Sequence, residues 1–286
     1  MKLPVFSSLL AIALAAGLSA ANAAEPLKAL LIAGGCCHDY AKQKDILKEG
    51  IEKRANIHVD VIYSEDHNTK PKFPIYGNPD YAKGYDVIIH DECAADINDQ
   101  AVVEGVLKPH RDGIPGVNLH CAMHCYRIGN PNEPGTPGTP HAFWFEYLGL
   151  QSSGHGSQLP IALSFTDKNS PITKGMSDWT TINEELYNNI KIYTGQALVH
   201  GKQTVKVKKK QADGTETEET KDNDYVVAWT NLYQGKTRVF STTIGHNNDT
   251  VKDDRYLDLV TRGLLWAVDK IDADGKPKAG YGPGGK

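Results

Sequence analysis

The densest group of potentially reactive side chains lies at residues 118–127, which read NLHCAMHCYR. Two histidines, His120 and His124, alternate there with two cysteines, Cys121 and Cys125. Imidazoles and thiolates bind zinc, a cysteine can be a nucleophile, and two cysteines can form a disulfide. The same residues could also be buried side chains without a chemical role. Residue types alone leave these possibilities open.

Two other stretches carry side chains of the same kinds. Residues 34–39 read GGCCHD and residues 90–93 read HDEC. Like the first stretch, each follows or ends a short apolar segment, which is typical of a buried β-strand. Their candidate residues are Cys36, Cys37, His38, His90 and Cys93.

The first half of the mature chain alternates between predicted strands and helices. Apolar periodicity predicts strands at 27–35, 57–64, 85–92 and 114–120, and helices at 40–55 and 97–113, the second ending at Pro109 and Gly113. Strands separated by helices form a parallel sheet, and ligands of such sheets bind beyond the carboxyl ends of the strands. All five cysteines and four histidines should therefore converge on one edge of one sheet. We expect this edge to be the functional site.

The second half is less regular but adds further candidates. The motifs GHG, EELY and IGH lie in or beside predicted strands, and a final amphipathic helix is predicted at 253–271. An aromatic cluster containing Trp144 could stack on a sugar ring or pack in the core. The candidate side chains of the three motifs are His155, Glu184, Glu185, Tyr187 and His246.

The first residues of the chain indicate export. Residues 1–23 combine a lysine, a short apolar run and a small-residue ending, Ala-Asn-Ala, which is typical of a secretory signal peptide cleaved after Ala23. No later segment is long and apolar enough for a membrane span. We therefore expect a periplasmic or secreted protein with a single domain at 24–270 and a flexible tail at 271–286.

Charge is unremarkable except in one segment. The net charge of −4 does not indicate the basic surface that binds nucleic acid. Residues 202–222 run from basic to acidic across Asp213 and Gly214, so we expect an inserted surface hairpin whose two arms pair opposite charges.

The order of several motifs resembles the ThuA-like (trehalose utilisation) family, which belongs to the class I glutamine-amidotransferase-like superfamily. The matching pieces are GVNLHCAMHCYR, GHG, EELY in place of the more usual DELY, VVAW, YQGKTRVFSTTIGH and RGLLWA. The resemblance implies one flavodoxin-like α/β domain, a three-layer sandwich around a mainly parallel sheet. It also implies a role in carbohydrate handling, in the breakdown of disaccharides or keto-sugars.

The resemblance further suggests a divalent metal, with zinc the natural candidate. A catalytic zinc needs about three protein ligands and an open position, for which we expect His120, His155 and His246. Cys37 or Cys121 could join or replace a histidine, and the alternative without metal is a polar cluster lining a sugar pocket. We expect His120 and Glu185 as acid–base groups. The substrate-binding residues we expect are His38, Glu184, Tyr187 and Trp144.

Cys121 supports an alternative chemistry. In the amidotransferase-like fold a nucleophile lies at the turn between a strand and a helix, and Cys121 lies at or beside such a turn. The usual glycines around that cysteine are missing from 118–127, and Asn248 stands where a carboxylate should follow His246. A Cys121-dependent hydrolase is therefore the alternative to metal-assisted chemistry.

The cysteines could instead be structural. Cys36 and Cys37 are adjacent, while Cys121 and Cys125 would share one face of a helix. A disulfide from either of the first two to either of the second two would connect neighbouring strand ends. With Cys93, five cysteines leave at least one unpaired, and the sequence does not choose the partners.

These observations predict an exported protein that acts on a small-molecule carbohydrate. The expected reaction is metal-assisted proton transfer beside a carbonyl of a keto-sugar or glycoside, as in isomerases and lyases. The alternatives are the Cys121-dependent hydrolase and a non-catalytic sugar-binding module. Nucleic acid is not an expected partner, and assembly into a homo-oligomer is left open.

Overall fold

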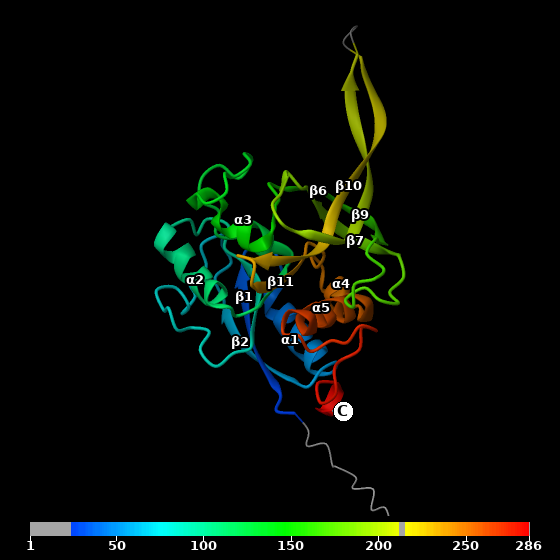
Figure 1. Ribbon diagram of the computed structural model, residues 1–286. Coiled ribbons are helices and arrows are strands. Elements are labelled where there is room, and N and C mark those ends of the chain that lie inside the picture. The colour runs from blue at the N-terminus through cyan, green and yellow to red at the C-terminus, as the bar shows by residue number, and fades with distance from the viewer. Residues whose placement is uncertain (1–23, 212–214, 286) are drawn as a thin grey trace, which may run out of the picture.

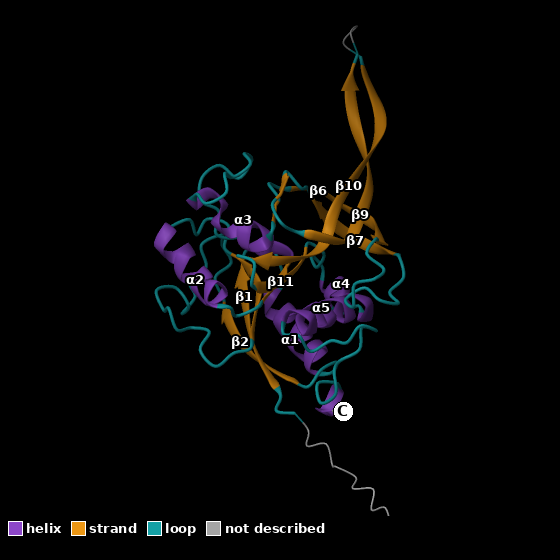
Figure 2. Cartoon of the chain, viewed as in Figure 1, coloured by secondary structure: helices purple, strands orange, loops and turns teal. Residues whose placement is uncertain are grey.

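The computed structural model describes residues 24–211 and 215–285. The predicted signal peptide and the Asp213–Gly214 turn lie outside these residues. Figures 1 and 2 show the arrangement of the elements. In chain order they are β1 (Leu27–Gly35), α1 (Tyr40–Glu52), β2 (Ile57–Ser64), β3 (Val87–Cys93), α2 (Gln100–Asp112), β4 (Gly116–Leu119), η1 (His120–His124), η2 (Pro140–Ala142), α3 (Phe143–Leu148), β5 (Leu150–Gln151), β6 (His155–Phe165), β7 (Trp179–Tyr187), β8 (Lys191–Ile192), β9 (Gln196–Lys210), β10 (Glu216–Tyr233), β11 (Thr237–Thr242), α4 (Asn248–Val251), α5 (Asp254–Ala267) and η3 (Pro283–Gly285).

One mixed sheet of nine strands runs through the molecule, in the order β2-β1-β3-β4-β11-β10-β9-β6-β7. The five strands from β2 to β11 are parallel, and the remaining four extend the sheet in antiparallel fashion. The expected parallel sheet therefore forms half of a larger one. The antiparallel half arises because a short turn joins β10 to β11 and a hairpin joins β9 to β10, connections that only antiparallel strands allow.

Helices cover both faces of the parallel half. Successive strand residues point to opposite faces, so Leu31 joins a core beneath α1 and α5, whereas Leu30 joins a second core beneath α2 and α3. We expected helix α2 to end at Pro109 and Gly113. The helix contains Pro109 and ends at Asp112, and Gly113 with φ +113° caps it. Both cores are built around the strands whose ends carry the candidate residues.

The charged segment forms the predicted hairpin. Strands β9 and β10 pair along its length and project far beyond the rest of the molecule (Figure 1). Because these charges are exposed, their ion pairs contribute little to stability. The pairs are Lys202–Asp222, Lys206–Glu218, Lys208–Glu216 and Lys209–Glu219.

The described part of the tail is packed rather than free, contrary to the expectation of a flexible segment. The backbone N–H of Asn56 donates to the carbonyl of Tyr281, and its side-chain amide donates to that of Gly280, both at 2.9 Å. Ile271 and Pro277 form an isolated β-bridge. Among the described residues, no helix is both long and apolar enough to cross a membrane.

Candidate functional site

The carboxyl edge of the parallel strands brings together histidines that are distant in sequence. His38 follows β1, His120 follows β4 and His246 follows β11. The ring centre of His38 lies 4.6 Å from that of His120 and 4.6 Å from that of His246. The convergence predicted from strand ends is therefore present for these three residues.

His120 occupies the sharp turn between β4 and η1. Its φ of +42° is unusual for a residue other than glycine, and its side chain is buried. Its Nδ1 lies 2.6 Å from the carbonyl oxygen of Thr243. Because a carbonyl only accepts hydrogen bonds, Nδ1 carries a proton, and Nε2 is the ring nitrogen left to bind a ligand. That Nε2 has no hydrogen-bond partner among the described residues.

Gly245 makes room for this arrangement. Its φ is +133°, and a Cβ there would lie 2.8 Å from the hydroxyl oxygen of Tyr256 and 3.5 Å from the Cβ of His120. A larger residue would therefore be strained and would crowd Tyr256.

Glu185 on β7 lies between three imidazoles. Its carboxylate oxygens are 3.4 Å from Nε2 of His120, 3.3 Å from Nδ1 of His246 and 3.5 Å from Nε2 of His155. Burial alone would raise the pKa of this carboxyl, but the contacts with His120 and His246 outweigh it and hold the pKa well below its usual value. Glu185 is therefore an anion beside Nε2 of His120.

One group of candidate metal ligands at this edge joins His120, Glu185 and His246. One ligand atom from each lies within 4.8 Å of the other two. Of the three residues of this group, His155, which we expected as a ligand, contacts Glu185, and its side chain is about two-fifths exposed. The group of candidate ligands therefore contains Glu185 where we expected His155.

The loop that carries His246 is held by two buried side chains. The carboxylate of Glu184 accepts hydrogen bonds from the backbone N–H groups of Gly245, His246 and Asn247, at 3.4, 3.0 and 3.3 Å. The amide of Gln43 on α1 donates to the carbonyl oxygen of His246 at 3.0 Å. Glu184 is fully buried, so it positions the loop and is not the substrate-binding residue that we expected.

Proton affinity at His246 differs from that at its neighbour His38. The carboxylate of Glu185, 3.3 Å from Nδ1, raises the pKa of His246. Burial, followed by the repulsion of His120 and His246, lowers the pKa of His38 to about 2. His38 is therefore neutral whenever the protein is folded near neutral pH.

Cys121 has a histidine neighbour that the sequence could not identify. Its Sγ lies 3.0 Å from Nε2 of His38. However, a hydrogen bond to Cys93 and burial raise the pKa of Cys121 far above its usual value. Because His38 is also neutral, the pair is a thiol beside an imidazole and not the ion pair of an activated cysteine.

Tyr187 forms a buried wall behind the site. Its ring stacks on His124 at 4.3 Å between centres and on His155 at 5.2 Å. Its hydroxyl lies 3.8 Å from Sγ of Cys121. Tyr187 is therefore placed beside the reactive groups, while His124 is held behind it by Ser152, 2.9 Å from Nε2.

Two expected site residues lie in the core instead. Trp144 is buried beneath the sheet, where its indole N–H donates to the carbonyl of Ala122 at 2.8 Å. It cannot stack on a sugar there. His90 is also fully buried, 2.8 Å from Glu92 and 3.1 Å from His110. His90 lies inside β3, and its side chain points to the face of the sheet where it contacts His110 of α2. Only residues beyond the strand end are free to turn toward a ligand.

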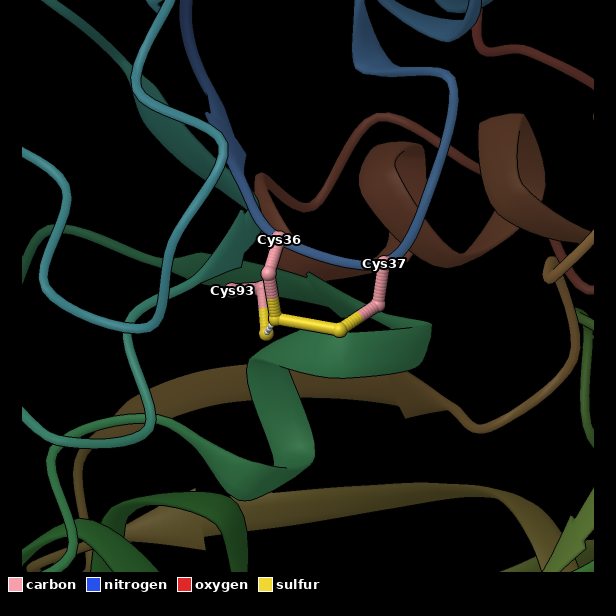
Figure 3. A group of neighbouring side chains, drawn as sticks. All are labelled: Cys36, Cys37 and Cys93. Atoms are coloured by element: carbon pink, nitrogen blue, oxygen red, sulfur yellow. Dashed lines mark hydrogen bonds between the residues drawn. A yellow bond between two sulfur atoms is a disulfide. The ribbon is translucent and has the colours of Figure 1, made fainter.

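The cysteines do not form the disulfide between strand ends that we considered. Cys36 and Cys37 form a disulfide with each other, while the thiol of Cys93 lies 3.3 Å from Sγ of Cys36 (Figure 3). Cys121 and Cys125 are free and buried. Sγ of Cys125 donates to the carbonyl of Glu92 and therefore has a structural role.

Sequence reasoning missed one polar contact of the site. The amide nitrogen of Gln158 on β6 lies 2.8 Å from Nε2 of His246 and 3.3 Å from Oε1 of Glu185. The available signal was its position three residues after His155, in a strand already predicted to adjoin the site. Pairing of β6 with β7, which carries Gln158 to Glu185, was not predicted.

A pocket of about 400 Å³ opens beside the histidines, lined by Cys37, His38, Asp39, His246, Asn247 and Asn248. A larger cavity of about 620 Å³ lies elsewhere and includes Arg111, Phe143 and Tyr193 in its walls. None of the candidate catalytic residues lines the larger cavity. We therefore assign the site to the smaller pocket.

Comparison with known proteins places this chain in a family. Residues 28–267 match the family model described as ThuA, trehalose utilisation. A solved structure described as a ThuA-like protein of Bacteroides uniformis ATCC 8492 is similar over 90% of this chain and 98% of its own, with a TM-score of 0.56 and 16% identity. That likeness concerns the fold alone, and no curated protein matched. Because the family match spans most of the sequence, the chain belongs to the ThuA (trehalose utilisation) family.

Proposed function

We propose that the protein catalyses metal-assisted proton transfer beside the carbonyl of a keto-sugar, as an isomerase or lyase does. The observation that carries the proposal is the convergence of His120, Glu185 and His246 within 4.8 Å. Nε2 of His120 and Nδ1 of His246 are buried and have no hydrogen-bond partner in the described structure. Unpaired buried nitrogens are costly, and a metal ion would satisfy both.

The donor set fits a catalytic zinc ion. Two imidazole nitrogens and one carboxylate form a common set of three protein ligands and leave a fourth position open. The hydrogen bond from Nδ1 of His120 to Thr243 fixes the tautomer that such binding needs. For His246 to bind through Nδ1, its Nε2 would carry the proton and Gln158 would present its amide oxygen to it, which gives up the contact of 3.3 Å between the Gln158 amide nitrogen and Glu185.

The remaining side chains suit proton transfer. A divalent ion held by the three ligands would polarise the substrate carbonyl and acidify the neighbouring C–H. His155 is partly exposed and lies 3.5 Å from Glu185, so it can accept and return that proton. His38 remains neutral and can only donate or accept a hydrogen bond at the pocket wall.

We further propose that the domain is a flavodoxin-like, class I glutamine-amidotransferase-like sandwich extended by four antiparallel strands. The order β2-β1-β3-β4-β11 supports this, because it is the doubly wound order 2-1-3-4-5, whose ligands bind where β1 and β3 diverge. His38 follows β1 at that point. Export of the protein to the periplasm or medium is part of the same proposal, supported by residues 1–23.

Deuterium exchange tests the reaction without assuming the final product. A panel of 3-keto-sugars would be incubated in heavy water, and loss of the proton next to the carbonyl would be followed by NMR. We expect wild-type exchange to fall about 100-fold or more in His155→Gln with metal content unchanged. His200→Gln is the matched control, since His200 pairs with Asp224 on the charged hairpin strands.

Two results would contradict this proposal. Metal-loaded wild-type protein that exchanges no proton in any keto-sugar would remove the reaction. Turnover that survives His155→Gln but disappears in a folded Cys121→Ser variant would favour the hydrolase, for which the contact of 3.0 Å between Cys121 and His38 is the supporting observation.

A further inference from the structure

Three sulfur atoms meet at the ends of two neighbouring strands. The Cys36–Cys37 disulfide lies in the turn after β1, and Cys93 ends β3 (Figure 3). Gly35 is the register partner of Cys93, and a Cβ at Gly35 would collide with the carbonyl oxygen of Cys93. Glycine thus permits the close backbone approach that places Sγ of Cys93 3.3 Å from Sγ of Cys36.

The surroundings of Cys93 favour its reactive form. Cys93 is a free thiol. A hydrogen bond with Cys121 lowers its pKa, and the positive charge of Arg127 acts in the same direction against the effect of burial. Thiolates are the attacking species in disulfide exchange. A thiol with a lowered pKa that touches a disulfide sulfur has both requirements for attack.

We propose that Cys93 exchanges with the Cys36–Cys37 disulfide and thereby releases Cys37 as a free thiol at the mouth of the pocket. The thiolate of Cys93 bonds to Sγ of Cys36, and the bond between Cys36 and Cys37 breaks. The electron pair of that bond leaves with Sγ of Cys37, which takes up the proton that Cys93 lost. One disulfide and one thiol are present before and after, so no oxidant or reductant is consumed.

The exchange changes which sulfur faces the solvent. Cys93 is buried, whereas Cys37 is exposed and lines the 400 Å³ pocket together with His38 and His246. The released thiol is a modification site for a small disulfide or an alkylating electrophile that enters this pocket. This inference rests on the sulfur geometry and not on the proposed proton transfer.

Peptide mapping can distinguish the two disulfide forms. Full-length protein would be treated with iodoacetamide at about pH 8 without reductant and then digested with trypsin. Trypsin does not cleave between Lys108 and Pro109, so residues 84–111 form the peptide that contains Cys93, and residues 29–42 contain Cys36 and Cys37; the exchanged form yields these two peptides joined, with Cys37 alkylated. We expect this product in the wild type and at least tenfold less alkylation of Cys37 in Cys93→Ser.

Matched variants make the result decisive. Cys36→Ser leaves Cys37 permanently free and gives the full labelling signal, while Cys125→Ser removes a buried thiol outside the group and should keep the exchange. Cys93→Ala replaces Cys93→Ser if circular dichroism shows that the serine variant is unfolded. Equal labelling of Cys37 with and without Cys93, or absence of the joined peptides from the wild type, would overturn the inference.

Discussion

His120 and Cys121 are adjacent in the chain, yet their surroundings favour opposite roles. Nε2 of His120 faces Glu185, because Nδ1 donates to the carbonyl of Thr243. Cys121 instead is a buried thiol whose pKa is raised by its hydrogen bond to Cys93. The first is placed to bind a metal ion through Nε2, and the second is not ionised.

This contrast predicts the outcome of two substitutions. His120→Ala should lower turnover about 100-fold or more, the scale expected for a lost catalytic group. Cys121→Ser should keep most of the turnover, because its sulfur forms no disulfide and is not a thiolate. Turnover of both variants should be measured beside their circular dichroism spectra. An inactive but folded Cys121→Ser beside an active His120→Ala would assign the chemistry to the thiol.

Two kinds of signal predicted residues of the site. His38 and His120 were named because they follow parallel strands, whereas Glu185 and His246 were named from the motifs EELY and IGH. Trp144 was misplaced because an aromatic cluster at a helix start has the same pattern whether it lines a pocket or a core. The adjacent Cys36–Cys37 disulfide depends on the turn after β1, which the sequence does not define.

At the scale of elements, β7 supports the site through two consecutive glutamates. Glu184 holds the backbone of the loop after β11, and Glu185 lies among the histidines. Strand alternation sends these two side chains in opposite directions. One residue therefore fixes the position of His246, and the other contributes charge to the cluster.

The two glutamates should differ when replaced by glutamine. Glu184→Gln removes an acceptor of backbone N–H groups in a buried place, so unfolding free energy should fall by about 1–3 kcal/mol. Glu185→Gln should abolish metal binding with a smaller loss of stability in the metal-free protein. Urea unfolding and metal titration of both variants test this. Equal stability losses would mean that Glu184 has no special role in the loop.

The parallel half of the sheet was predictable, whereas of the antiparallel half only the β9–β10 hairpin was predicted. Alternating apolar runs and amphipathic helices define β1 to β4 from local periodicity. Strands β6, β7 and β9 extend the same sheet through pairings between segments distant in sequence, and local patterns carry no information about such partners. Gln158 was missed for this reason, because only the β6–β7 pairing brings it to Glu185.

At the scale of the whole molecule, buried neutral histidines should make stability depend on pH. Burial lowers the pKa of His38, His110 and His124 below the unfolded value of 6.5, so unfolding binds a proton at each as the pH falls below that value. Asp91 acts oppositely, since burial raises its pKa and unfolding releases its proton. Unfolding therefore binds about three protons at these histidines and releases one at Asp91, a net uptake of about two protons.

The free energy of unfolding should therefore fall by roughly 3 kcal/mol per pH unit between about pH 6 and 5. Urea unfolding with a chelator present measures this without a contribution from metal. His38→Gln should reduce the slope by about one proton. A stability that is constant or rises as the pH falls through this range would contradict the burial of the neutral imidazoles.

The proposed export also concerns the whole chain. The side-chain amide of Asn56 donates to the carbonyl of Ala24 at 2.8 Å, so contacts of the domain reach the first residue after the predicted cleavage site. Protein recovered from the periplasm of a Gram-negative host should therefore begin at Ala24. Mass spectrometry of the intact N-terminus tests this, and soluble cytoplasmic protein retaining Met1 would refute it.

The metal content of the purified protein tests the central claim most directly. Protein prepared without chelator should hold about one divalent ion, zinc by preference, measured by plasma mass spectrometry. His120→Ala and His246→Ala should lose it, whereas His155→Gln and the control His200→Gln should retain it. Wild-type protein that holds no metal and gains none when zinc is added would contradict the account.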